Sequence, residues 1–247
     1  MTISSKQEKH ASGRIKVCVV RTVIDYPEVK AFLRSSKQKG RERLRRDDFV
    51  WHEILLSFAT WGSSRGAAKL NFDALTYGSL SRLQSSKRRT LVAQQFKTAG
   101  LRYATKKTDY LLYNFGLVRE KGGLDAANGA VLSEGLDCDA RIEALREYKG
   151  IGEKYAYNIM MDAYHPQFHD AIAVDVRIRN ISKELGLAAS KYNDYVTFYR
   201  KAASDIGIDP WDLDRVLYKF QKPILECLRG GTRPMAEMVQ EALAPKG

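Results

Sequence analysis

Apolar side chains recur at helical spacing along most of the chain, and this pattern limits the fold more than any other feature. The segment 47–60 shows it best, because four apolar residues share one of its faces: Val50, Ile54, Leu55 and Phe58. Prolines number only six, and no proline-rich or serine-rich linker interrupts the pattern. We therefore predict an all-α fold with about a dozen helices.

The same pattern sets the expected helices. They cover residues 27–35, 47–60, 104–118, 139–148, 153–164, 174–186, 190–205 and 210–228, with shorter helices between 63 and 99. Residues 15–24, IKVCVVRTVI, are rich in β-branched side chains, which predicts a short strand or an irregular extended stretch. Residues 1–14 are polar, and we expect them to be disordered.

The chain is strongly basic: 41 Lys and Arg oppose 29 Asp and Glu among 247 residues, which gives a formal net charge of +12. This charge favours a nucleic acid or another anionic surface as partner, although a basic surface without a specific partner has the same composition. The densest basic run is KQKGRERLRR, Lys37–Arg46, which could contact phosphates or form a solvated flexible arm.

Targeting segments are not evident in the sequence. No run approaches the roughly 18 apolar residues that a membrane span needs. The first residues, MTISSKQEKHASGR, lack the apolar stretch of a signal peptide. We expect a cytoplasmic protein, at the nucleoid of a bacterium or an archaeon, or a nuclear protein in a eukaryote.

Three cysteines, Cys18, Cys138 and Cys227, stand far apart and form no CxxC pair. Their spacing indicates neither a zinc site nor a disulfide framework, and three thiolates are too few for a cysteine-ligated iron–sulfur cluster. We therefore predict three buried, reduced thiols and no metal or other cofactor.

Two glycines separate two predicted helices in the segment Leu145–Ile159, LREYKGIGEKYAYNI. Gly150 and Gly152 allow positive φ angles and the close approach of another molecule, and Ile151 between them would fill the angle between the helices. The backbone N–H groups at the start of the second helix would attract an anion, and a nucleic-acid phosphate is the natural choice for a basic protein. The alternative is an ordinary helical hairpin with a glycine cap.

This segment, Leu145–Ile159, resembles the helix-hairpin-helix of the endonuclease III and 8-oxoguanine DNA glycosylase superfamily, whose hairpin has the form L-P-G-V-G-x-K-x-A. A Val-Asp motif follows at the family's spacing, because Asp175 comes 21 residues after Lys154. The resemblance spans residues 48–187. Two flanking segments resemble further helices of the family: Phe49–Leu70 and Gly100–Leu112.

Several positions differ from the family pattern. Lys149 stands in place of the usual proline, and Arg177 in place of the histidine that often follows the Val-Asp motif. The glutamine that usually follows the first conserved helix is absent from SFATWGSS, residues 57–64, and no four-cysteine loop follows the Val-Asp motif. The chain therefore looks like a lysine-bearing member of the family without an iron–sulfur cluster.

The resemblance implies two helical domains with an active-site cleft between them. One barrel-like domain would cover 62–163 and end in the helix-hairpin-helix at 140–163, and the other would be built from 15–61 and 164–247. The implied partner is double-stranded DNA that contains a modified base, bound by a monomer away from any membrane. The hairpin could also hold a monovalent cation. The residues implied in DNA binding are Lys149, Gly150, Ile151, Gly152 and Arg177.

Two residues take the family's catalytic positions. Lys154 matches the lysine that attacks C1′ of the sugar and forms a Schiff base, which permits strand cleavage by β-elimination. Asp175 matches the carboxylate that stabilises the oxocarbenium-like sugar. Each has a common alternative role, since a helix lysine is usually a solvated charge and Asp175 could simply N-cap a helix. Trp61 and Trp211 are candidates for a base pocket, although both could belong to the core.

We therefore expect a bifunctional DNA glycosylase and AP lyase that excises a damaged or modified base, with an oxidised purine such as 8-oxoguanine as the leading substrate. Three alternatives stay open. The enzyme could remove an unusual modified base from foreign phage DNA, or the hairpin could belong to a non-catalytic DNA-binding protein. The basic run could instead bind RNA, which would more naturally come with exposed aromatic motifs.

Overall fold

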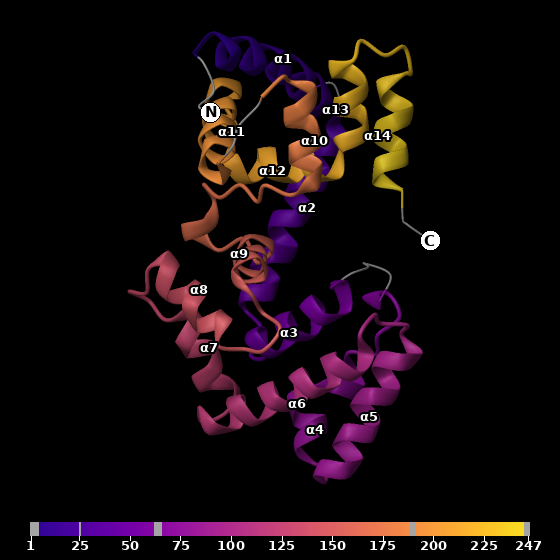
Figure 1. Cartoon of the computed structure of the whole chain (residues 1–247), viewed down its shortest axis with the longest axis vertical. Helices are drawn as coiled ribbons and strands as arrows, with labels where there is room; N and C mark the ends of the chain where they lie inside the picture. Colours follow the sequence, from indigo (N-terminus) through magenta and orange to yellow (C-terminus); the bar gives the residue numbers. More distant parts are fainter. Residues whose placement is uncertain (1–4, 25, 62–65, 188–190, 245–247) are drawn as a thin grey trace. The chain divides into compact units, whose positions relative to one another are not determined.

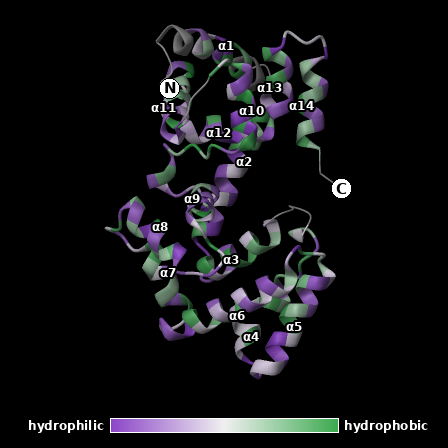
Figure 2. Ribbon diagram, in the orientation of Figure 1, coloured by the Kyte–Doolittle hydropathy of each residue, from purple (hydrophilic) through white to green (hydrophobic). Residues whose placement is uncertain are grey.

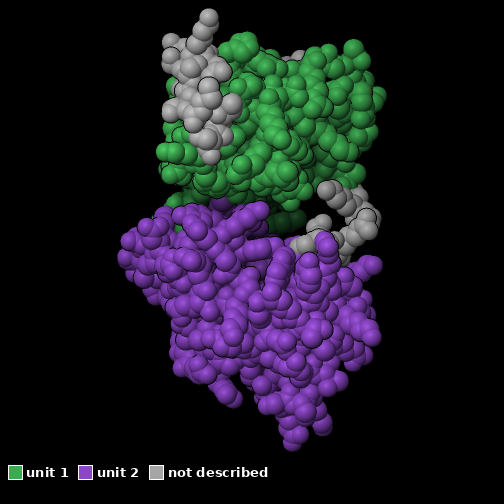
Figure 3. Space-filling model, viewed as in Figure 1, with its two compact units in different colours: residues 1–40, 164–247 green, residues 41–163 purple. Residues whose placement is uncertain are grey.

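The computed structural model describes residues 5–24, 26–61, 66–187 and 191–244. Fourteen α-helices follow one another within these ranges, and the same ranges contain no strand, which confirms the prediction of an all-α chain (Figure 1). None of the helices in the described ranges combines the length and the apolar character needed to cross a membrane. The chain divides into two compact units, coloured separately in Figure 3: unit 1 is 1–40 with 164–247, and unit 2 is 41–163.

Unit 2 is a cluster of helices around α3. Helix α3 packs on α6, α7 and α9, while α5 packs on α6 and α8 lies against both α7 and α9. The described elements of this unit are α3 (Phe49–Thr60), the 3₁₀ turn η2 (Asp73–Leu75), α4 (Tyr77–Ser81), α5 (Ser85–Thr98), α6 (Ala104–Glu120), α7 (Leu124–Leu132), α8 (Cys138–Arg146) and α9 (Glu153–Asp162).

Helix α3 is almost entirely buried, with nine of its 12 residues in the interior. The backbone N–H and carbonyl groups at its two ends therefore need hydrogen-bond partners from the protein instead of from water. At the start, the side-chain oxygen of Asn128 from α7 accepts a hydrogen bond from the Val50 N–H at 3.0 Å. At the end, the Lys107 ammonium group from α6 donates to the carbonyls of Phe58 and Trp61 at 2.7 and 2.9 Å. Both ends of α3 are thus capped by other helices.

Unit 1 brings together the two ends of the chain. Helix α1 packs on α11 and α13, α10 packs on α12 and α13, and α14 packs on α13. Figure 2 shows hydrophilic and hydrophobic residues alternating along these helices, as expected for elements that each bury one side. The unit contains α1 (Ser5–Ile24), η3 (Pro166–Phe168), α10 (Val176–Glu184), α11 (Tyr192–Ile206), α12 (Pro210–Lys219), α13 (Gln221–Leu228) and α14 (Met235–Leu243), and α2 (Pro27–Leu44) runs from it into unit 2.

The prediction for the first 24 residues is wrong. Helix α1 runs through 15–24, where we expected a strand or extended stretch, and through 5–14, where we expected disorder; residues 1–4 lie outside the described residues. The buried side chains of α1 have the helical spacing i, i+4, i+7 and i+8: Ala11, Ile15, Cys18 and Val19. Contact with α11 and α13 stabilises a helix that its β-branched residues disfavour locally.

The prediction of three reduced thiols is also wrong. Cys18 of α1 and Cys227 of α13 form a disulfide, and Cys138 keeps its thiol. The two bonded residues are 209 positions apart, so their sequence spacing gives no sign that α1 and α13 are neighbours. Arg14 reinforces the same contact, because its guanidinium donates to the carbonyls of Glu184 and Leu228 at 3.1 and 2.8 Å. These are the last residues of α10 and α13.

Three boundaries differ from those expected. We expected a domain boundary at 61/62, whereas the division into compact units starts unit 2 at Arg41, and α3 packs on α6, α7 and α9 of this unit. The helix expected over 27–35 continues to Leu44, so most of the Lys37–Arg46 run is helical and is not a flexible arm. The helix expected over 210–228 is two helices, α12 and α13, and sequence reasoning misses α7 and α14.

The disulfide gives the first testable prediction. Cross-links that close long loops stabilise proteins by about 2–4 kcal/mol, so the C18S/C227S double variant should unfold at a lower urea concentration by that free energy. Added reductant should lower the urea midpoint of the wild type and leave the double variant unchanged. Cys138→Ser is the matched control and should respond to reductant as the wild type does. Equal midpoints for reduced and oxidised wild type would contradict the disulfide's role.

Candidate functional site

The turn between α8 and α9 alternates buried and exposed residues. Tyr148 and Ile151 are buried, whereas Lys149 and Gly152 are exposed. The Ile151 N–H donates to the Tyr148 carbonyl at 3.0 Å, which closes the turn. Because the Ile151 side chain is only 3% exposed, this residue can offer a DNA strand its backbone and nothing else. The outer surface of the turn is therefore made of one lysine and glycine backbone.

A buried asparagine fixes the turn to α6. The Asn114 amide donates to the Lys149 carbonyl at 3.0 Å, and the Lys149 N–H donates to the Asn114 side-chain oxygen at 2.8 Å. Asn114 is fully buried, so leaving its side-chain amide without partners would be costly. The sequence contains Asn114 in a predicted helix but gives no sign of this pairing.

Gly150 is required by both its conformation and its surroundings. Its φ angle is +90°, in the region that side chains other than glycine rarely adopt. A Cβ atom at this position would lie 2.6 Å from Phe58 Cε1 and 3.0 Å from Tyr110 Cδ2. The turn is therefore pressed against α3 and α6. Gly152 differs, because its backbone is extended and a Cβ atom there would meet no other atom within 4 Å.

Two lysines flank the glycines on the surface of unit 2. The Lys149 ammonium group lies 3.7 Å from the centre of the Tyr113 ring, which is itself 47% exposed. Lys154 is exposed in the first turn of α9, two residues after Gly152, and the exposed Glu153 lies between them. The first N–H groups of a helix have no partner within the helix, so N–H donors and two lysines lie at this edge, together with the carboxylate of Glu153. This edge can bind an anion such as a phosphate.

Asp175 belongs to unit 1, where it is the N-cap of α10. Its Oδ1 accepts hydrogen bonds from the N–H groups of Arg177 and Ile178 at 2.8 and 3.1 Å. Its Oδ2 lies 3.5 Å from Arg177 Nη1, and the side chain is 18% exposed. The N-cap role that we expected as an alternative is therefore present, and it leaves one carboxylate oxygen outside the cap.

The segment before Asp175 is held by two side chains that sequence reasoning misses. The Ala173 N–H donates to Asp214 Oδ1 at 2.8 Å, and Asp214 is buried. The Val174 N–H donates to the Tyr192 hydroxyl at 3.3 Å. On the far side of the cap, the Arg177 guanidinium stacks 3.9 Å from the Tyr218 ring centre. These contacts position Asp175 and Arg177 within unit 1.

The two tryptophans suggested for a base pocket differ in exposure. Trp211 is 1% exposed and lies edge-to-face with Tyr164 in unit 1, with ring centres 4.8 Å apart, as expected for the alternative role in the core. It is a core residue because α12 turns it inward. Trp61 is half-buried in unit 2, stacks on Tyr110 at 6.4 Å between ring centres, and has Lys106 6.0 Å from its ring. It keeps a partly accessible face.

Lys107, which caps α3, is a second lysine with unusual surroundings. Burial and the positive charge of Arg102 lower its pKa to about 8. Its ammonium group is occupied by the two carbonyls at the end of α3. The sequence does not distinguish Lys107 from its neighbour Lys106: both are lysines of one helix, yet Lys106 is exposed and Lys107 is buried.

Comparison with known proteins finds no matching protein family, no matching curated protein and no matching solved structure. Within the described residues, no three His, Cys, Asp or Glu side chains gather in a way that could hold a metal ion.

The turn gives a paired prediction about stability. Gly150→Ala should lower the free energy of unfolding by about 3 kcal/mol, because it combines a strained φ angle with a clash against Phe58. Gly152→Ala, two residues away, should change it by less than about 0.5 kcal/mol. Urea unfolding followed by circular dichroism measures both, and equal losses for the two variants would show that the turn is not pressed against α3.

Proposed function

We propose that this protein is a DNA glycosylase with AP lyase activity, which removes a damaged or modified base from duplex DNA and then cuts the strand. An oxidised purine such as 8-oxoguanine is the leading substrate. The observation that carries the proposal is the α8–α9 turn, in which the exposed Gly152 is followed two residues later by the exposed Lys154. Phosphate binding and a nucleophilic amine are thereby supported at one helix start.

The turn supplies the sequence-independent part of binding. The N–H groups at the start of α9 and the Lys149 ammonium group can neutralise a phosphate, and the tie to Asn114 keeps them in place before DNA arrives. Chemistry at the sugar requires that the target base leave the duplex. A turn with little side chain on its outer surface suits a close approach to the backbone of the strand.

Lys154 would act as the nucleophile. Its neutral amine attacks C1′, the bond from C1′ to the base breaks, and the base leaves with the bonding electrons and takes up a proton. The amine loses its protons as the sugar ring opens to a Schiff base. Loss of a C2′ proton then expels the 3′ phosphate, which cuts the strand, and water releases the lysine.

Asp175 would support the same reaction by its charge. A carboxylate near the sugar stabilises the positive charge that develops as the base departs. The N-cap bonds use Oδ1, so Oδ2 is the oxygen that could face this charge. Arg177, held over the Tyr218 ring, would bind a phosphate.

Borohydride trapping tests the nucleophile. Wild-type protein should form a covalent adduct with duplexes that contain 8-oxoguanine or an abasic site, and Lys154→Ala should form none. Lys107→Arg is the control, since Lys107 is a competing amine with a lowered pKa and a guanidinium group forms no Schiff base. An adduct with Lys154→Ala would contradict the assignment. A wild type that binds duplex DNA but never gives an adduct would favour the non-catalytic alternative.

Asp175→Asn separates charge from capping, because asparagine is an equally good N-cap. We expect single-turnover base excision to fall at least about 100-fold, with thermal stability unchanged. Asp137, the N-cap of α8, gives the matched control: Asp137→Asn should leave excision unchanged. Excision by Asp175→Asn at the wild-type rate would reduce Asp175 to a cap.

A further inference from the structure

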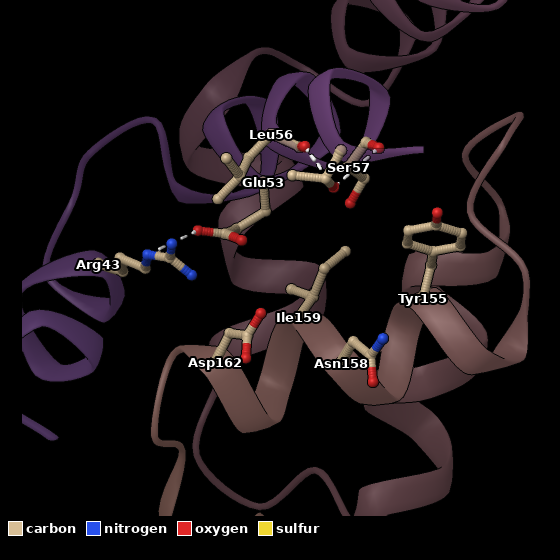
Figure 4. A pocket seen from close by; sticks show the side chains of 9 residues that line it. Arg43, Glu53, Leu56, Ser57, Tyr155, Asn158, Ile159 and Asp162 are labelled. Atoms are coloured by element: carbon tan, nitrogen blue, oxygen red, sulfur yellow. Dashed lines mark hydrogen bonds and ion pairs between the residues drawn. The ribbon is translucent and has the colours of Figure 1, made fainter. Parts of the chain in front are cut away.

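Unit 2 contains a cavity of about 160 Å³ between α3, α9 and the end of α2 (Figure 4). An apolar cavity of about 150 Å³ admits a benzene ring, so this space suits one flat ring system. Apolar contact comes from Leu56 and Ile159. The polar side chains in its lining include Arg43, Glu53, Tyr155, Asn158 and Asp162.

Glu53 is the unusual member of this lining. Its side chain is 2% exposed on the buried helix α3, and its Oε1 has no hydrogen-bond partner among the described residues. The Arg43 guanidinium lies 3.8 Å from that oxygen, too far for a hydrogen bond. A buried polar atom without a partner costs stability, so a group that supplies donors would relieve the cost.

The charges around Glu53 come from three elements. Burial raises the pKa of Glu53 to about 7; Arg43 opposes this effect, Asp162 adds to it, and Arg46 and Asp48 contribute with opposite signs. In Figure 4, Glu53 on α3 and Asp162 on α9 point toward each other, with Arg43 at one side. The carboxyl group can therefore ionise near neutral pH when a ligand offers it donors.

Helix α9 connects this cavity to Lys154. Asn158 and Asp162 follow Lys154 at i+4 and i+8, so the three side chains lie on one side of the helix. The helix rise places Asn158 about 6 Å and Asp162 about 12 Å along the axis from Lys154. Lys154 and two residues of the cavity lining therefore share one side of α9.

The cavity lining holds two carboxyl groups and one guanidinium group, beside hydroxyl and amide groups that can donate or accept. Ionised Glu53 and Asp162 accept only, and Arg43 is the single cationic donor in the lining. A carboxylate takes two neighbouring N–H groups at once, which is the arrangement on the N1–H and 2-amino edge of guanine. Adenine and cytosine carry an acceptor beside a donor on the corresponding edge and would leave one pairing unmade.

We infer that this cavity receives the extruded base and that the Glu53 carboxylate reads a guanine-type edge by accepting from N1–H and the 2-amino group. The inference rests on the proposed function and names its substrate class, purines with the guanine edge, which 8-oxoguanine retains. Tyr155 and Ile159 flank the ring, and Asn158 contacts the part of the base nearest the sugar. Glu53 is thus a specificity-determining residue and takes no part in bond breaking.

The test combines a protein change with a base change. Glu53→Gln replaces an acceptor by an amide of the same shape, and 8-oxohypoxanthine lacks only the 2-amino group of 8-oxoguanine. We expect Glu53→Gln to excise 8-oxoguanine about 100-fold more slowly than wild type. This factor corresponds to the loss of one hydrogen bond to a charged group. Wild type should excise 8-oxohypoxanthine about 10-fold more slowly than 8-oxoguanine. For Glu53→Gln, the excision rates of these two bases should differ by less than about twofold.

Trapping on a duplex with a preformed abasic site separates the two proposals, because no base enters the cavity. Glu53→Gln should trap this duplex as well as wild type, and Glu120→Gln, an exposed change at the end of α6, should match wild type throughout. The midpoint of urea unfolding at pH 8 should be no lower for Glu53→Gln, since the amide has no charge to bury.

Two outcomes have different meanings. If wild type excises 8-oxoguanine and Glu53→Gln does so equally fast, or if the variant keeps the 10-fold discrimination, the assignment of the cavity is overturned and the glycosylase proposal stands. If wild type neither excises a base nor traps abasic DNA, the proposed function fails and this inference fails with it.

Discussion

A buried helix must have its end groups hydrogen-bonded, and in unit 2 this requirement falls on α3. Each large side chain of α3 contributes about 1.5–3 kcal/mol by leaving water, yet each unpaired N–H or carbonyl at its ends would cost about 1–3 kcal/mol. Asn128 of α7 and Lys107 of α6 remove that cost by hydrogen-bonding to the two ends of α3. The same buried helix then places Phe58 beneath Gly150 and Glu53 against the cavity. The shape of the candidate site follows from the burial of one helix.

The basic residues of this protein have internal uses as well as a surface role. Four of them bind the carbonyls at helix ends, where the helix dipole favours positive charge. Arg88 donates to the carbonyls of Leu80, at the end of α4, and of Leu83, just after it. Arg141 donates to those of Val131 and Ser133 at the end of α7. Arg14 and Lys107 do the same elsewhere. Part of the positive charge therefore stabilises contacts between helices.

Periodicity and glycine placement made the helical class and the α8–α9 turn predictable, because both are local properties of the chain. Helix α1 was hidden by its composition, since Ile15 and Val19 suggest a strand until their helical spacing is considered. The partners Asn114 and Asp214 could not be predicted, because each acts through a contact with a distant segment. Glu53 is hidden for the same reason: on a helix, burial of one glutamate depends on which neighbours surround it. Residues 62–65, beside Trp61, lie outside the described residues.

The disulfide has a topological consequence for the whole chain. Residues 18 to 227 form one covalently closed loop, and all of unit 2 is inserted in that loop. A protease cut anywhere within 41–163 would therefore leave the two fragments bonded through α1 and α13. Such a nicked protein would migrate as a single band on a gel without reductant and separate into two only when reduced. Unit 1 would keep both of its chain segments joined even after the connection through unit 2 was broken.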